Sequence, residues 1–185
     1  MPDIVLETER LILRTAGEGD GELLYGHLNS AKLKEHIDGP AELVELQQRV
    51  ANMIAAQARD GFSFLLMHEK DTGELVGHCG LKRVDAKGAP NPGDIEIGWV
   101  VREDRWRRGY AGEAVKAVLR WAFEVHDASH VVALTSEANE ASWRFMEALG
   151  LERRTDLDFD DPDYPPEENP TKVYTITRER WEKPA

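Results

Sequence analysis

The chain has 185 residues, enough to bury the core of one domain and few for two. Hydrophobic residues make up 41% and charged residues 31%, a composition typical of a globular protein. The formal net charge of −12 opposes nonspecific binding to nucleic acid or to an anionic membrane, because its field repels phosphate. We therefore expect a single domain over residues 1–185, with no nucleic-acid or membrane partner.

The sequence also indicates a compartment. Its first ten residues, MPDIVLETER, lack the basic and apolar regions of a signal peptide. No apolar run reaches the 18 residues of a membrane-spanning helix. The single cysteine, Cys79, allows no internal disulfide and suits a reducing environment. Together these features predict a cytoplasmic protein.

Hydrophobic periodicity and turn residues predict a mixture of strands and helices in chain order. Predicted strands cover 9–15, runs from Phe62 and from Leu75, then 95–101, 130–136 and 172–181. Predicted helices lie within 19–37, from Pro40 to residue 57, from the glycines at 109 and 112 onward, and over 139–150. Loops are expected at 87–94 and 156–170. This mixture is typical of an α+β or α/β sheet protein.

A basic stretch containing glycines lies between a predicted strand and a predicted helix. It reads RWRRGYAGEA (Arg105–Ala114), and Arg102 lies just before it. The free N–H groups at a helix start suit a phosphate, and Gly109 and Gly112 leave room for its approach. The stretch matches neither a Walker loop nor the dinucleotide fingerprint. It predicts an anion site, with solvated arginines around a tight turn as the alternative.

Three motifs in order extend this interpretation: EIGWVV, WRRGYAGEA and NEASWRFMEALGL. With LETERLILR near the start and VYTITRERW near the end, they resemble the GNAT superfamily, in particular its RimJ/RimL branch of ribosomal-protein N-terminal acetyltransferases. The resemblance implies an α+β fold with a central mixed, mostly antiparallel sheet, split in a V and flanked by helices. It also implies acetyl-CoA as co-substrate. The pyrophosphate would bind at Arg107, Arg108, Gly109, Tyr110, Ala111 and Gly112.

One position departs from the pattern of the branch. The glycine that usually follows the tryptophan is Arg107 here. An arginine keeps its backbone N–H and adds a side-chain contact to phosphate, but we expect it to exclude the positive φ that glycine tolerates.

The resemblance also assigns backbone and side-chain contacts to the pantetheine arm. Trp99 and Val101 would offer backbone groups to the arm and the thioester carbonyl, and Asn139 would bind a pantetheine amide. The alternative for Asn139 is simple capping of the helix that follows it. Gly98 indicates, independently of the resemblance, a bulge, a close approach or a packing contact within its strand.

Two residues are candidates for catalysis. Glu96 interrupts an apolar strand, and it faces either water or a cleft where burial would raise its pKa. The resemblance makes Glu96 the base, acting through a water. It makes Ser142 the proton donor to the thiolate, with stabilisation of the helix start as the alternative. Where many members of the superfamily have a tyrosine, this chain has Met146, so Tyr164 and Tyr174 are further candidate donors.

The predicted reaction is direct transfer of acetyl from acetyl-CoA to a primary amine. The resemblance to the branch makes the N-terminus of a protein or peptide the preferred acceptor. The alternatives are a small cationic amine, such as a polyamine or an aminoglycoside, and a non-catalytic module that binds acyl-CoA. The acidic residues of 156–168 would attract a cationic acceptor or would only be solvated. No metal-binding pattern is found, and analogy with the branch allows a homodimer.

Overall fold

The computed structural model describes residues 2–183. Two compact units are present: residues up to Lys82 with Gly98–Val118, and Arg83–Ile97 with residues from Leu119 onward. Eight strands form one sheet in the order β1-β2-β3-β4-β5-β6-β8-β7. The pair β5/β6 is parallel, with Glu96 opposite Val132, whereas the pairs β1/β2, β2/β3, β3/β4, β6/β8 and β7/β8 are antiparallel. The predicted mixed, mostly antiparallel sheet with flanking helices is confirmed.

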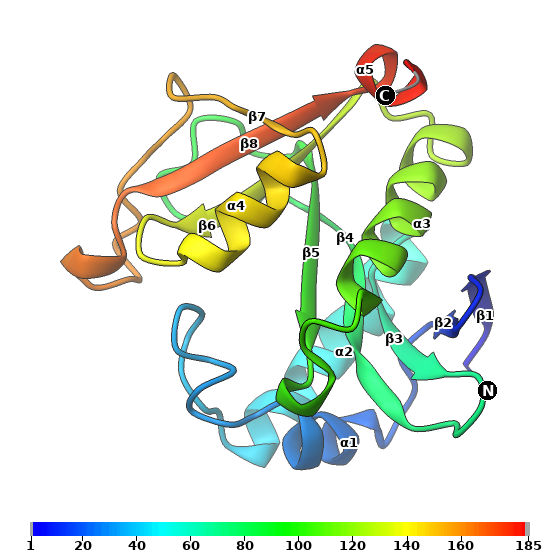
Figure 1. The fold of residues 1–185 in the computed structure, drawn as a ribbon. Coiled ribbons are helices and arrows are strands. Elements are labelled where there is room, and N and C mark those ends of the chain that lie inside the picture. The colour runs from blue at the N-terminus through cyan, green and yellow to red at the C-terminus, as the bar shows by residue number, and fades with distance from the viewer. Residues whose placement is uncertain (1, 184–185) are drawn as a thin grey trace. The chain divides into compact units, whose positions relative to one another are not determined.

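The first unit packs two helices against its strands (Figure 1). Its elements are β1 (Ile4–Glu7), β2 (Leu11–Arg14), α1 (Asp20–His27), α2 (Leu43–Asp60), β3 (Phe64–Glu69) and most of β4 (Leu75–Arg83). One buried apolar cluster joins Leu24 of α1 and Leu46 of α2 to Leu66 of β3 and Leu75 of β4. This burial of apolar side chains holds α1 and α2 on one face of the strands.

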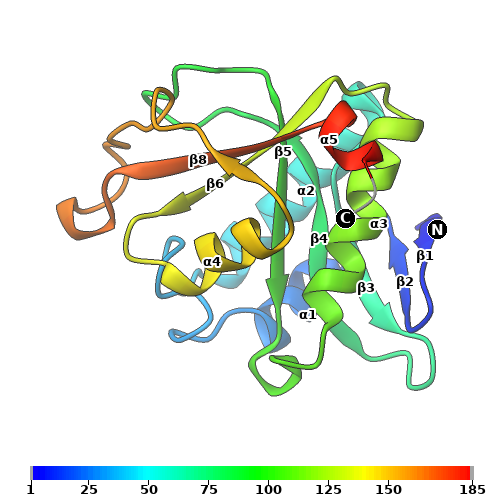
Figure 2. The same ribbon diagram turned by 45° about the horizontal axis from the view of Figure 1, so that its top comes forward.

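The second unit packs α4 against a group of strands, and both views show α4 running along β6 and β8 (Figures 1 and 2). Its elements include β6 (His130–Ser136), α4 (Glu140–Ala148), β7 (Glu152–Arg153), β8 (Thr171–Thr177) and α5 (Arg178–Glu182). Val84, Val132 and Val173 form a buried cluster there. Three elements have residues in both units: β4, whose last residue Arg83 belongs to the second unit, β5 (Ile95–Val101) and α3 (Tyr110–Glu124).

Several predicted boundaries differ from the observed ones, and three of the differences have a local reason. The first helix ends at His27, because the Asn29 side chain bonds both backbone groups of Ala41 instead of continuing the helix. The second begins at Leu43 and not at Pro40, since Glu42 is its N-cap. The last strand ends at Thr177, whose hydroxyl accepts from a backbone N–H of α5. The short strands β1 and β7 were not predicted.

Candidate functional site

The basic stretch forms an open loop with a row of unpaired donors. A 3-10 turn (Glu103–Arg105) follows β5, and α3 begins at Tyr110. Within residues 2–183, no hydrogen bond is found for the six backbone N–H groups from Arg107 to Gly112. A Cβ at Gly112 would have no atom within 4 Å, so the space beside the helix start is open. Free donors and open space at a helix N-terminus fit a phosphate group.

Arg107 adopts the backbone conformation that we expected it to exclude. Its φ is +58°, in the left-handed region, and Gly109 two residues later has a φ of +81°. The expectation was wrong because the left-handed region is costly for arginine but not closed to it. The surrounding contacts must therefore compensate for a strained residue inside the loop.

This strain gives a first prediction. Replacing Arg107 with glycine should raise the free energy of unfolding of the ligand-free protein by about 1 kcal/mol, because glycine reaches positive φ without a steric penalty. Arg108 is the matched control, since its φ is not positive and its side chain is also exposed. Arg108→Gly should lower stability by about 0.5–1 kcal/mol. Denaturant midpoints measure both, and equal losses in the two variants would contradict the strain argument.

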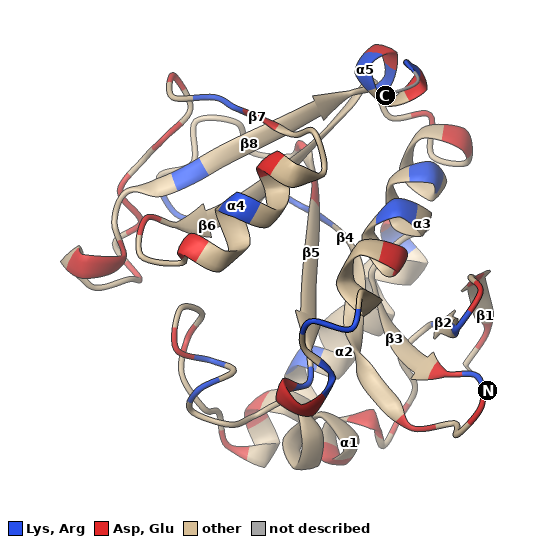
Figure 3. Ribbon diagram, in the orientation of Figure 1, with Lys and Arg blue, Asp and Glu red and all other residues tan. Residues whose placement is uncertain are grey.

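The four arginines of the loop divide into two pairs. Arg102 and Arg105 are held by Asp104 at 2.9 and 3.3 Å, and both also lie near a carboxylate of the β3–β4 turn. Arg107 and Arg108 are exposed, and within the described chain neither makes an ion pair. Figure 3 shows this basic segment between β5 and α3. Arg107 and Arg108 are therefore the side chains that remain for an anionic ligand.

Sequence reasoning missed Arg10, which joins β2 to the start of α3. Its Nη1 donates to the carbonyl of Arg108 at 2.9 Å, and its Nε donates to Glu113 at 2.7 Å. The guanidinium also lies 4.4 Å from the centre of the Tyr110 ring. Burial opposes ionisation of Glu113, but hydrogen bonds from Thr8 and Arg10 lower the pKa of that carboxyl. The ion pair between Arg10 and Glu113 holds the loop in place. Because 103 residues separate the two, no local motif in the sequence indicates the pair.

At the end of β5, strand alternation determines which backbone groups point away from β4. The N–H of Arg102 donates to Val76 of β4 at 2.8 Å, so strand alternation turns the peptide groups of Val101 and Trp99 to the opposite edge. The carbonyl of Val101 already accepts from the Trp106 indole at 2.7 Å. Of the two backbone groups of Val101, the N–H is therefore the one that can serve a ligand while that bond persists.

Gly98 has a packing role. A Cβ there would lie 2.9 Å from the Phe64 ring of β3, closer than side-chain atoms normally approach. Of the interpretations left open for this glycine, close packing against the neighbouring ring is the one that the structure supports.

The second unit contains the candidate catalytic residues. Glu96 is only 8% exposed, so the alternative of an exposed strand face is wrong. Asn139 caps α4, with its Oδ1 accepting from the Ser142 N–H at 3.2 Å. The amide nitrogen of Asn139 makes no hydrogen bond within residues 2–183, so capping and ligand binding are compatible at this residue. The half-buried Ser142 hydroxyl likewise lacks a partner in the described chain.

Tyr174, one of the further candidate donors, is buried and its hydroxyl is already hydrogen-bonded. It is 1% exposed, and its hydroxyl donates to Glu147 at 3.0 Å. Burial, followed by this hydrogen bond, raises the pKa of Tyr174 to about 12. Met146 is buried in the core. Ser142 is thus better placed than Tyr174 to give up a proton.

The acidic loop is neutralised in part by neighbouring cations. Arg154 pairs with Asp156 at 2.6 Å, Arg153 with Asp158 at 2.5 Å and Lys87 with Asp163 at 2.7 Å. Asp161 is 5% exposed and accepts the backbone N–H of Asp163. These bonds organise the loop internally and reduce its attraction for a cationic acceptor.

No helix among the described residues is long and apolar enough to cross a membrane. Within residues 2–183, no three His, Cys, Asp or Glu side chains are grouped so that they could hold a metal ion.

Comparisons with known proteins find a matching family and solved structures of similar fold. The family described as acetyltransferase (GNAT) domain matches residues 10–152. The uncharacterized N-acetyltransferase YoaA of Bacillus subtilis is 26% identical over 80% of this chain and 83% of its own. The crystal structure of an acetyltransferase from Agrobacterium tumefaciens C58 has a TM-score of 0.75 at 27% identity, covering 94% of each chain. RimL, a ribosomal L7/L12 alpha-N-protein acetyltransferase solved with coenzyme A, has a TM-score of 0.78 at 17% identity, covering 96% of this chain and 99% of its own.

Proposed function

Because the chain belongs to the GNAT family of acetyltransferases, we propose that it acetylates the N-terminal amine of a protein or peptide. The acetyl donor of the family is acetyl-CoA. The observation that supports binding of this donor at the loop is the row of unpaired N–H groups from Arg107 to Gly112. These donors, with the exposed Arg107 and Arg108 side chains, would bind the pyrophosphate. The free amide nitrogen of Asn139 and the N–H of Val101 would bind the pantetheine arm.

Direct attack by an amine requires a neutral nucleophile and a proton for the departing sulfur. Glu96 would accept the proton that the amine loses as its nitrogen bonds to the acetyl carbon. Ser142 would donate a proton to the sulfur as the carbon–sulfur bond breaks, and would recover one from solvent. The bound thioester supplies the activated acetyl group. No residue of the chain is acetylated in this scheme.

The acceptor is the more specific part of the proposal. It is supported by the ordered RimJ/RimL motifs and by the fold shared with RimL, whose described activity is α-N-acetylation of a ribosomal protein. The competing acceptor, a small cationic amine, rested on the net charge and on the acidic loop. Since Arg153, Arg154 and Lys87 neutralise three acids of that loop, the structure gives the competing acceptor less support.

One experiment separates the acceptors. Purified protein and acetyl-CoA are incubated with peptides that carry a free N-terminus and an internal lysine, and separately with polyamines. Fragmentation by mass spectrometry places the added acetyl group. Acetylation at the peptide N-terminus is expected. Turnover with polyamines alone would reject the peptide acceptor, while acetylation at the lysine would reject the preference for the terminal amine.

A further inference from the structure

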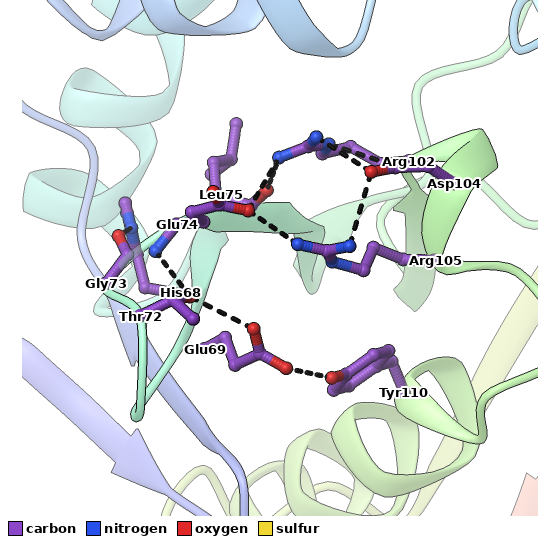
Figure 4. Close-up of polar contacts among 10 residues, drawn as sticks. All are labelled: His68, Glu69, Thr72, Gly73, Glu74, Leu75, Arg102, Asp104, Arg105 and Tyr110. Carbon is purple, nitrogen blue, oxygen red and sulfur yellow. Dashed lines mark hydrogen bonds and ion pairs between the residues drawn. The ribbon is translucent and has the colours of Figure 1, made fainter.

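The turn between β3 and β4, Glu69–Leu75, contacts both ends of the basic loop (Figure 4). At the front end, Oε2 of Glu74 lies 2.5 Å from Arg105 and 3.7 Å from Arg102. Arg102 also donates to the carbonyl of Leu75 at 2.9 Å. One turn thus binds two arginines that precede the strained residue Arg107.

At the other end, the Tyr110 hydroxyl donates to Oε1 of Glu69. This hydrogen bond raises the pKa of Tyr110 and lowers the pKa of Glu69. Thr72 holds the second oxygen of Glu69 at 3.0 Å, so the carboxylate has a fixed orientation. Tyr110 is 5% exposed and is the first residue of α3. The same turn therefore fixes the residue at which the loop becomes helix.

Between these two anchors lie the exposed Arg107 and Arg108 and the unpaired N–H groups. A conformation that includes arginine at positive φ persists only where its surroundings impose it. A loop already held in its binding geometry loses less entropy when an anion binds. By holding the loop in place, the contacts of the β3–β4 turn therefore favour binding of acetyl-CoA.

We propose that Glu74 is a positioning residue for acetyl-CoA: by holding Arg105, it keeps the loop Arg107–Gly112 in the conformation that binds pyrophosphate. This role rests on the proposed donor site. Simple electrostatics predicts the opposite sign for its removal, because a carboxylate close to an anion site repels the anion. The direction of the change in affinity therefore separates positioning from mere proximity of charge.

The test is Glu74→Gln, with the dissociation constant of acetyl-CoA measured by calorimetry. We expect about two- to fivefold weaker binding, which is the size of a half-exposed ion pair. In turnover assays KM for acetyl-CoA should rise while kcat at saturation stays unchanged. Glu7→Gln is the matched control. It removes the 3.1 Å ion pair to Lys70 in the same turn but touches no residue of the loop, and its affinity should equal that of the wild type.

A double-mutant cycle tests whether Glu74 acts through Arg105. If it does, Glu74→Gln combined with Arg105→Gln should bind acetyl-CoA no more weakly than Arg105→Gln alone. Additive losses, or equal or tighter binding by Glu74→Gln, would overturn the proposal. Melting temperatures without ligand verify that each variant is folded. Failure of the wild type itself to bind acetyl-CoA would reject the donor site, whereas normal wild-type binding with an unaffected Glu74→Gln would reject only the positioning role.

Discussion

Replacing Glu96 with glutamine is expected to lower kcat by about a hundredfold or more, the usual cost of losing a general base. Glutamine matches the size of glutamate but cannot accept the proton of the attacking amine. The 8% exposure of Glu96 means that the substitution changes an enclosed position and not a solvated one. The rate of acetyl transfer at saturating acetyl-CoA and acceptor, followed by release of free thiol, measures the effect.

The pH profile distinguishes a base from a structural carboxylate. The wild type should lose activity as pH falls, because a protonated base cannot act, and Glu96→Gln should lose that acidic limb. The acceptor amine titrates in the same way with both proteins, so a limb present only in the wild type belongs to Glu96. Glu140→Gln, an exposed carboxylate of α4 paired with Arg144, is the control and should match the wild type. If the two proteins lose activity in the same way as pH falls, the limb belongs to the amine or to another group, and Glu96 is not the base.

The elements predicted most accurately are those whose ends carry strong local signals. The strands 95–101 and 130–136 match β5 and β6 residue for residue, because glycine, proline and polar residues bound segments that are mostly apolar. The helix α4 begins after its cap at Asn139, and Gly150 follows its end with a φ of +88°. Such signals act within a few residues, so a single sequence is enough to find them.

Features formed by distant residues were missed for the complementary reason. Arg10 and Glu113 are 103 residues apart, and Tyr110 and Glu69 are 41 apart, yet each pair forms a direct bond. Nothing in the sequence near either partner signals the other. The same limit explains Arg107: its positive φ is imposed by the contacts of the surrounding loop, against its own local preference. Sequence motifs located the candidate site, but the contacts that shape it are tertiary.

Reversing the charge of Arg108 should weaken binding of acetyl-CoA by about ten- to a hundredfold, since one attractive contact to phosphate becomes a repulsive one. Arg108 is exposed and its side chain is unpaired within the described residues, so Arg108→Glu breaks no internal ion pair and the fold should persist. Arg120→Glu, an exposed site later on α3, makes the same change of net charge away from the loop and should bind nearly as the wild type does.

Thermal shift provides the readout: ligand at 100 times its dissociation constant stabilises the wild type by about 2.7 kcal/mol, and a tenfold loss of affinity removes about half of that. If both reversals weakened binding equally, the long-range field of the protein would explain the effect, and Arg108 would not contact the phosphate. If neither did, the free side chains of the loop would be irrelevant, and the backbone N–H groups alone would hold the pyrophosphate.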